Sequence, residues 1–186
     1  MNKKLNKTSL LLWKRGFIIK KLIIVSAVII AILSINKEEN IVVPKESIRF
    51  RIVANSNSST DQKIKKEILN SLSTKIVETN KLTSLDNTRK YINKNINQFT
   101  EIVDKTLTKN NYSTSFNINY GKNYFPKKVY KNVIYEEGEY ESLVITLGDG
   151  KGKNFWCVLF PPLCMLDEDN DIEYKSLIKE TLDKYF

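Results

Sequence analysis

Alternating apolar and polar positions predict four strands in this chain. In residues 48–54 every second side chain is large and apolar, from Ile48 to Ile52, which is the period of a strand with one buried face. A similar alternation or a short apolar run marks residues 116–120, 143–147 and 155–160. Glycines between the last two runs suit a hairpin loop. We therefore expect a sheet of about four strands.

Apolar residues at helical spacing predict about three helices. The first carries an isoleucine or leucine at every fourth position from Ile64 to Ile76, after a capping box formed by Ser59 and Gln62. The second begins near Ser84 and ends at Asn110 and Asn111, and its apolar face comprises Ile92, Ile96, Phe99, Val103 and Leu107. The third begins near Asp171, with Leu177, Ile178 and Leu182 on its inner face. These elements predict an α+β fold in one small domain, residues 48–186.

A different pattern occupies residues 1–36. Residues 22–35 contain no charged side chain, and seven lysines and arginines precede them without an acid. This is the layout of a signal peptide or a transmembrane anchor. Lys20 and Lys21 can snorkel, so an anchor would run from Phe17 to Ile35. An uncleaved anchor is favoured because no pair of small residues marks a cleavage site, and a cleaved signal stays open.

The positions of the cations predict where the domain lies. Basic residues stay on the cytoplasmic side of a membrane, so the polar linker at 37–47 and everything after it should lie outside the cytoplasm. We therefore expect a protein exported across the cytoplasmic membrane. The first cysteine is Cys157, which excludes a lipid-modified cysteine close behind the apolar run.

Composition removes several classes of function. The chain has no histidine and two cysteines, which excludes Ser-His and Cys-His catalysis and the usual zinc sites. Its net charge of +9 first suggests a nucleic-acid binder. Seven of its 30 basic residues precede residue 22, however, which leaves 23 against 21 acids in the rest. Without a concentrated basic footprint we expect no nucleic-acid partner, and no metal, cofactor or small-molecule substrate is indicated.

Two further stretches contain residues that could bind phosphate or catalyse acid/base reactions. The glycines at 148, 150 and 152 precede Lys153, but the spacing and the following strand do not match a phosphate-binding loop. Four glutamates at 136–141 could pair for acid/base work, although a solvated strand edge is the simpler interpretation. They leave one alternative function open, that of an extracytoplasmic wall-associated enzyme or binding protein.

The segment at 155–164 is apolar on both faces of its predicted strand. Such a strand is either covered twice or leaves one face for a partner. Two interpretations follow: the aromatic residues are ordinary core, or they form a partner-binding surface beside a rigid proline turn. The candidate partner-binding residues are Asn154, Trp156, Phe160, Pro161 and Pro162.

The two cysteines also have two interpretations. Cys157 and Cys164 could form an extracytoplasmic disulfide, or they could be two buried thiols. A bridge would stabilise the fold by about 2.5 kcal/mol on the chain-entropy estimate, provided the Cα atoms lie within about 7 Å. Export favours the bridge.

Three segments together resemble a known family. Residues 148–164, GDGKGKNFWCVLFPPLC, are similar to the hallmark segment of the stage II sporulation protein R family. Residues 48–68 and 125–145 resemble the blocks that precede it, so the resemblance covers about 44–167. The sequence departs from the family at Phe155, where a tryptophan is expected, at Lys131 in place of glycine and at Lys153 in place of histidine.

The resemblance implies a signalling protein and no enzyme. Members of the family are secreted by the forespore during endospore formation. They act as protease activators: by protein contact they switch on a membrane-embedded aspartic protease, which processes pro-sigma-E. For this chain the resemblance implies export into the intermembrane space, that protease as partner, and no catalytic residue.

Overall fold

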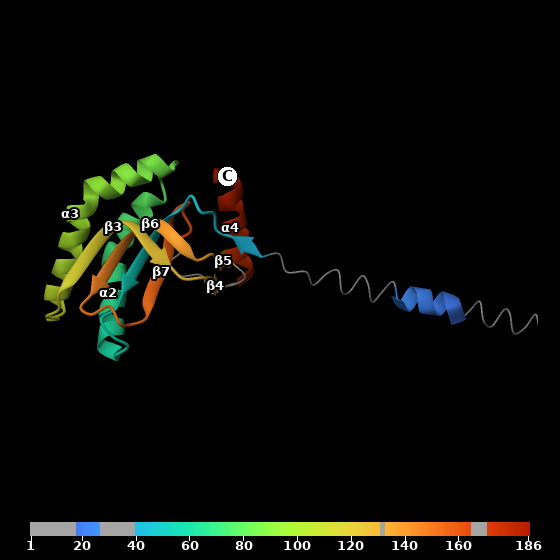
Figure 1. The fold of residues 1–186 in the computed structure, drawn as a ribbon, viewed down its shortest axis with the longest axis horizontal. Helices are drawn as coiled ribbons and strands as arrows, with labels where there is room; N and C mark the ends of the chain where they lie inside the picture. Colours follow the sequence, from blue (N-terminus) through green and yellow to red (C-terminus); the bar gives the residue numbers. More distant parts are fainter. Residues whose placement is uncertain (1–17, 27–39, 131–132, 165–170) are drawn as a thin grey trace, which may run out of the picture. The chain divides into compact units, whose positions relative to one another are not determined.

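The structure is a computed structural model that describes residues 18–26, 40–130, 133–164 and 171–186 (Figure 1). The chain divides into two compact units, 1–39 and 40–186. In the first unit, residues 18–26 are helical. No helix within the described ranges is long and apolar enough to cross a membrane. Most of the segment expected as an anchor, from Phe17 to Ile35, lies outside those ranges.

The second unit is α+β and is built on a four-stranded sheet of order β3-β6-β2-β7. Its strands are β2 (Ile48–Val53), β3 (Phe116–Phe125), β6 (Gly138–Leu147) and β7 (Asn154–Phe160). Strand β2 is central, parallel to β6 and antiparallel to β7, while β3 pairs antiparallel with β6. All four predicted strands are confirmed, but β3 and β6 are longer than expected. Their extra residues pair with each other, Gly121 with Ser142 through Phe125 with Gly138, in stretches whose sequence lacks a clear apolar–polar alternation. The expected hairpin between β6 and β7 was wrong, because β2 lies between these two strands.

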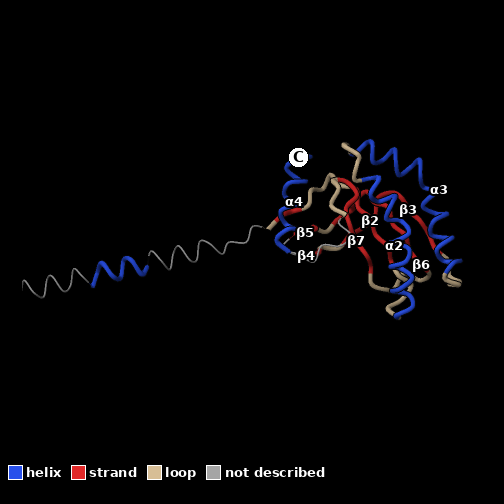
Figure 2. Tube along the Cα trace, turned by 180° about the vertical axis from the view of Figure 1, so that it is seen from behind, coloured by secondary structure: helices blue, strands red, loops and turns tan. Residues whose placement is uncertain are grey.

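Two long helices, α2 (Ser59–Thr79) and α3 (Leu85–Lys109), pack on one face of this sheet (Figure 2). The expected capping residue of α2 was wrong by one position, because Ser58 Oγ accepts the hydrogen bond from the Asp61 amide. Gln62 instead donates to the Ser56 carbonyl. The predicted apolar faces are confirmed: isoleucines and leucines of α2 and α3 meet Phe50, Ile52, Leu143 and Ile145 in one core.

A second sheet was not predicted. It has three strands in the order β1-β5-β4: β1 (Ile41–Val42), β4 (Lys128–Tyr130) and β5 (Val133–Tyr135). Strands of two or three residues are too short to show a period in sequence. Strand β1 falls within the segment expected as a linker, and the following Val43 is buried. The folded unit therefore includes residues that sequence polarity assigned to the linker.

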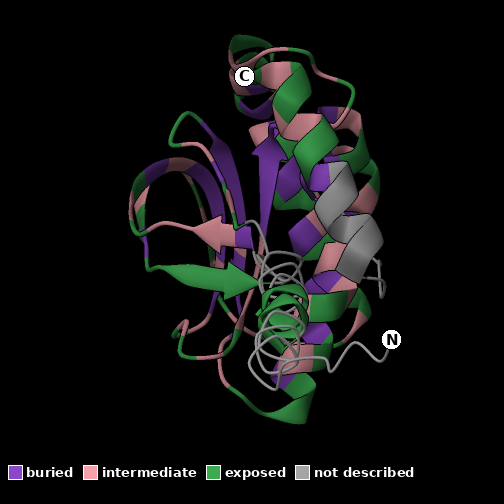
Figure 3. Cartoon of the chain, turned by 90° about the vertical axis from the view of Figure 1, so that its right-hand side faces the viewer, coloured by how far each residue is buried: buried purple, intermediate pink, exposed green. Residues whose placement is uncertain are grey.

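The small sheet and the last helix cover part of the other face of the main sheet. Helix α4 (Asp171–Tyr185) brings Ile178 into a cluster with Val43, Val133, Val158 and Leu163. In Figure 3 the strands at the centre are coloured as buried, and exposed residues lie on the outer sides of the helices. Strand β7 is thus covered on both faces at Val158 and beyond, as the first of the two interpretations of its apolar pattern required.

The least expected feature of the core is Arg49. Sequence alternation places it on the polar face of β2, yet it is only 1% exposed. Its guanidinium lies 3.3 Å from the centroid of the Tyr140 ring and 5.3 Å from that of Phe125. Both terminal nitrogens make long hydrogen bonds of 3.4 Å to the Glu136 carbonyl oxygen. Burial lowers the pKa of Arg49, and the neighbouring tyrosines oppose that shift. Among the residues that the structure describes, Arg49 is therefore held by cation–π contacts and carbonyl hydrogen bonds and by no ion pair.

We predict that Arg49→Lys lowers the free energy of unfolding by about 2 kcal/mol. A lysine ammonium cannot stack flat on Tyr140 or present two donors to Glu136, and it is more strongly hydrated than a guanidinium. Arg51→Lys, on the same face but half-buried, serves as control and should cost less than about 1 kcal/mol. Urea unfolding of the purified protein measures both. Equal stability of Arg49→Lys and wild type would show that the stack is not needed.

Candidate functional site

The candidate partner-binding residues do not form one exposed patch. Phe160 is 6% exposed and belongs to the core under α2 and α3, where its ring packs edge-on against Tyr185. In a regular strand Phe160 would share a face with Trp156, four residues earlier, and would point away from this core. The reason for the difference is a register shift in the β2–β7 pairing: Ile48 opposes Phe160 while Arg49 opposes Val158, so Leu159 is an extra residue. The bulge turns Phe160 toward the helices.

The other candidates differ in exposure. Pro161 is buried, whereas Asn154, Trp156 and Pro162 are partly exposed. The side-chain oxygen of Asn154 is buried and has no hydrogen-bond partner among the described residues. Only the first half of β7 and one proline are therefore accessible to a partner. The proposal that Phe160 is an exposed anchor is not supported by its position.

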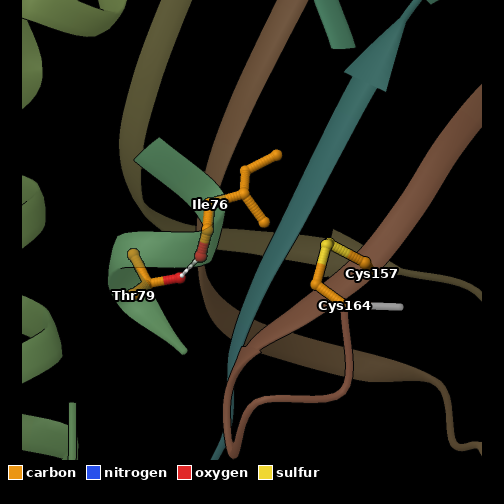
Figure 4. Close-up of a disulfide and its surroundings, with 4 residues drawn as sticks. All are labelled: Ile76, Thr79, Cys157 and Cys164. Atoms are coloured by element: carbon orange, nitrogen blue, oxygen red, sulfur yellow. Dashed lines mark hydrogen bonds between the residues drawn. A yellow bond between two sulfur atoms is a disulfide. The ribbon is translucent and has the colours of Figure 1, made fainter. Parts of the chain in front are cut away.

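Cys157 and Cys164 form a disulfide. Their Cα atoms are 4.9 Å apart, so the proline turn brings them within the required distance. Figure 4 shows the bridge near the end of α2, where Thr79 Oγ1 donates to the Ile76 carbonyl at 2.6 Å. Both cysteines are buried in the same core as Ile76. The bridge thus fixes the turn after β7 to the main core.

Trp156 lies in a stack of cationic and aromatic groups on the second face of the sheet. Its ring meets Phe125 edge-on, with centroids 5.0 Å apart. The Arg51 guanidinium is 4.7 Å from the Phe125 centroid and 5.6 Å from that of Trp156. Lys128 Nζ lies 5.3 Å from the Trp156 centroid. The tryptophan is therefore flanked by two cations.

Two more lysines approach the same end of β7 from the helix side. Lys65 of α2 donates from Nζ to the Lys153 carbonyl oxygen at 2.9 Å. Burial lowers the pKa of Lys65, and the positive charges of Lys153 and Lys128 lower it further. We call Arg51, Lys65, Lys128 and Lys153 the basic cluster. The basic cluster leaves no signal in the sequence, because its members are far apart along the chain and the overall charge of the domain is nearly balanced.

The glycine-rich loop that precedes β7 is held against residues 54–57. The amides of Gly152 and Lys151 donate to the carbonyls of Ala54 and Asn55 at 2.9 and 3.0 Å. The Lys153 amide donates to Asn57 Oδ1 at 2.8 Å. A Cβ atom at Gly152 would lie 2.2 Å from the Ser56 carbonyl oxygen. Close backbone approach, and no phosphate chemistry, explains this glycine.

A buried carboxylate supports that loop through hydrogen bonds. Asp61 accepts hydrogen bonds from Tyr112 Oη at 2.5 Å and from Asn55 Nδ2 at 3.1 Å. Asn55 Oδ1 in turn accepts from the Asp149 amide at 2.9 Å. Hydrogen bonds from the side chains of Ser56, Tyr112 and Asn55 lower the pKa of Asp61 to about 2. The aspartate is thus an ionised structural acceptor under physiological conditions.

Two of the glutamates at 136–141 form ion pairs with basic residues. Glu141 forms an ion pair with Arg89 at 2.9 Å and accepts from Tyr120 Oη at 2.5 Å. Burial opposes its ionisation, but the hydrogen bonds from Arg89 and Tyr120 outweigh this and lower the pKa of Glu141. Glu136 pairs with Lys127 at 3.1 Å. Within the described ranges no group of three or more acids and cysteines could hold a metal ion.

The Asp61 network predicts a specific loss of stability in acid. The folded-state pKa of about 2 lies below the ordinary value of 3.8, so the folded state binds fewer protons. This contribution is complete above about pH 4 and is lost as the pH falls toward about 2. We expect Asp61→Asn to be less stable at pH 6 and to lose less stability between pH 4 and 2. Urea midpoints over this range measure both, and parallel pH profiles would contradict the network.

The disulfide predicts that the native protein has no free thiol. Alkylation of the unfolded protein without reductant should leave its mass unchanged, while reduction first should add two labels. The Cys157→Ser/Cys164→Ser variant should lose about 2.5 kcal/mol of unfolding free energy through loss of loop closure. Two labels without reductant would show that the cysteines are core thiols and that the prolines alone hold the turn.

Comparisons with known proteins agree with the sequence resemblance. Residues 44–170 match the family described as Stage II sporulation protein R. A protein of that name from Bacillus subtilis (strain 168) is 40% identical over 151 residues, which cover 80% of this chain. The match spans 66% of the length of that relative. No solved structure matches the chain.

The matched region includes every element that builds the candidate site. It begins before β2 and extends past the disulfide, so it contains the glycine-rich loop, the basic cluster and the hallmark segment at 148–164. The resemblance found in the sequence is therefore confirmed. On this ground the chain belongs to the stage II sporulation protein R family and has a role in sporulation.

Proposed function

We propose that this protein is an exported signal of endospore formation, which activates a membrane-embedded aspartic protease by direct contact. The protease then processes pro-sigma-E. Family membership over residues 44–170 is the observation that carries the proposal. In this proposal the forespore releases the signal into the space between the two membranes. There the signal reaches the protease of the mother cell.

Two features of the chain support an extracytoplasmic location for the folded unit. The basic residues before residue 22, followed by an uncharged run, are typical of an export segment. The folded unit also contains a disulfide, and such bonds persist mainly outside the reducing cytoplasm. Residues from about 40 onward are therefore proposed to lie outside the cytoplasm.

Activation by contact requires that the signal has different affinities for the inactive and the active state of the protease. A ligand shifts a protease between inactive and active states only as far as it binds the active state more tightly. A change from 1% to 99% active would need about a 10⁴-fold preference, which is about 5.5 kcal/mol. A rigid recognition surface raises the affinity because little conformational freedom is lost on binding, while the preference comes from contacts that the active state offers and the inactive state lacks. The disulfide and the loop held by Asn55 and Asn57 provide such rigidity at β7.

The alternative of a wall-associated enzyme has less support. Glu136 and Glu141, which could have served as an acid/base pair, are each engaged by a cation. The pKa of Glu141 is lowered, which is the opposite of what a general acid at neutral pH needs. No observation on the site favours a substrate over a protein partner.

The proposal predicts a loss of sigma-E activity in a strain that lacks this gene. A sigma-E-dependent reporter should stay at background, and immunoblots should show unprocessed pro-sigma-E. The wild-type gene should restore both readouts, whereas a version without residues 1–36 should not, since the protein would stay in the cytoplasm. A deletion strain with normal reporter activity, or full rescue by the truncated version, would refute the proposal.

A further inference from the structure

Strand β7 lies at an edge of the main sheet and pairs with β2 alone among the described strands. The Val158 carbonyl accepts a hydrogen bond from the Leu163 amide at 3.1 Å, so it points away from β2. In an antiparallel pair, the backbone groups of alternate residues point to the same side. The amide and carbonyl of Trp156 therefore also point outward, toward the free edge. An extended chain could pair with them.

The basic cluster lies around Trp156, beside this edge. Arg51 and Lys128 flank the Trp156 ring on one face, and Lys65 and Lys153 meet on the other. None of these four side chains forms an ion pair with a described residue. Within the described ranges the positive charge of the basic cluster is not balanced by ion pairs, although the folded unit carries nearly as many acids as bases. Concentrated positive charge at a strand edge is complementary to an acidic extended segment.

We propose that an acidic, extended segment of the partner protein adds to the free edge of β7 at Trp156, with its carboxylates on the basic cluster. The inference rests on the proposed function for the identity of the partner, the membrane-embedded protease. An anionic membrane surface is the competing occupant. The free strand edge favours the peptide, because lipid headgroups make no use of outward backbone donors and acceptors in register.

The test uses the full-length protein and the detergent-solubilised protease as probe. Lys128→Glu/Lys153→Glu reverses two exposed charges of the basic cluster, and Lys90→Glu/Lys94→Glu reverses two exposed charges on α3 as a matched control. We expect the first variant to bind at least about tenfold more weakly at 0.1 M salt and the control to bind as wild type. The difference should shrink at about 0.5 M salt because the charges are screened. Urea midpoints should show that both variants are folded.

Hydrogen exchange tests the strand addition directly. In the free protein the amide of Trp156 should exchange quickly, and the protease should slow it, while amides that already bond to β2 change little. Unchanged exchange at Trp156 upon binding would overturn pairing at β7. Equal binding by the two double variants would overturn the role of the basic cluster.

The outcomes separate this inference from the proposed function. If wild-type protein does not bind the protease and the sigma-E reporter does not depend on this gene, the proposed function fails. If the reporter depends on the gene but Lys128→Glu/Lys153→Glu binds and signals normally, only the inference fails. Binding of wild type to vesicles of anionic phospholipid, lost in this variant while protease binding is kept, would assign the basic cluster to the membrane and overturn the proposal.

Discussion

The fold depends on a central strand that is buried on both faces with different chemistry on each. Ile48, Phe50 and Ile52 of β2 join the core under the two long helices. On the other face Arg49 is buried as a cation between aromatic rings, with carbonyl oxygen and no carboxylate as its acceptor. A guanidinium can occupy such a place because it is planar and weakly hydrated. This stack lets one β-strand connect the helical layer to the aromatic cluster that carries Trp156.

Most residues of the hallmark segment at 148–164 have a structural role. Gly152 allows the loop to approach Ser56, the disulfide fixes the turn to the core, and the bulge directs Phe160 to the helices. Of β7 and the turn that follows it, a partner can reach only the first half of the strand, its edge and Pro162. The segment is thus better understood as a rigid support for a small exposed surface than as the surface itself, and under the proposed function this rigidity lowers the entropic cost of binding the partner.

Recognition at β7 would combine two sources of specificity. Backbone pairing at a strand edge supplies register and affinity but little selectivity, while charges placed beside the edge select the sequence of the added segment. Arg51, Lys65, Lys128 and Lys153 come from β2, α2, β4 and the loop, so the basic cluster exists only when all of these elements are packed. The basic cluster is therefore lost when any of these elements unfolds.

The sequence by itself determined the main strands, the long helices and their buried faces, because periods of two and of nearly four residues are local properties of the chain. It also indicated the family, through three segments whose residues are specific to that family. Three matters were decided by tertiary structure alone. The short strands at 41–42, 128–130 and 133–135 form only by pairing with one another, Phe160 changes face through a bulge in its pairing with β2, and Arg49 is buried because distant rings surround it. Each depends on contacts between residues far apart in the chain, which no local pattern records.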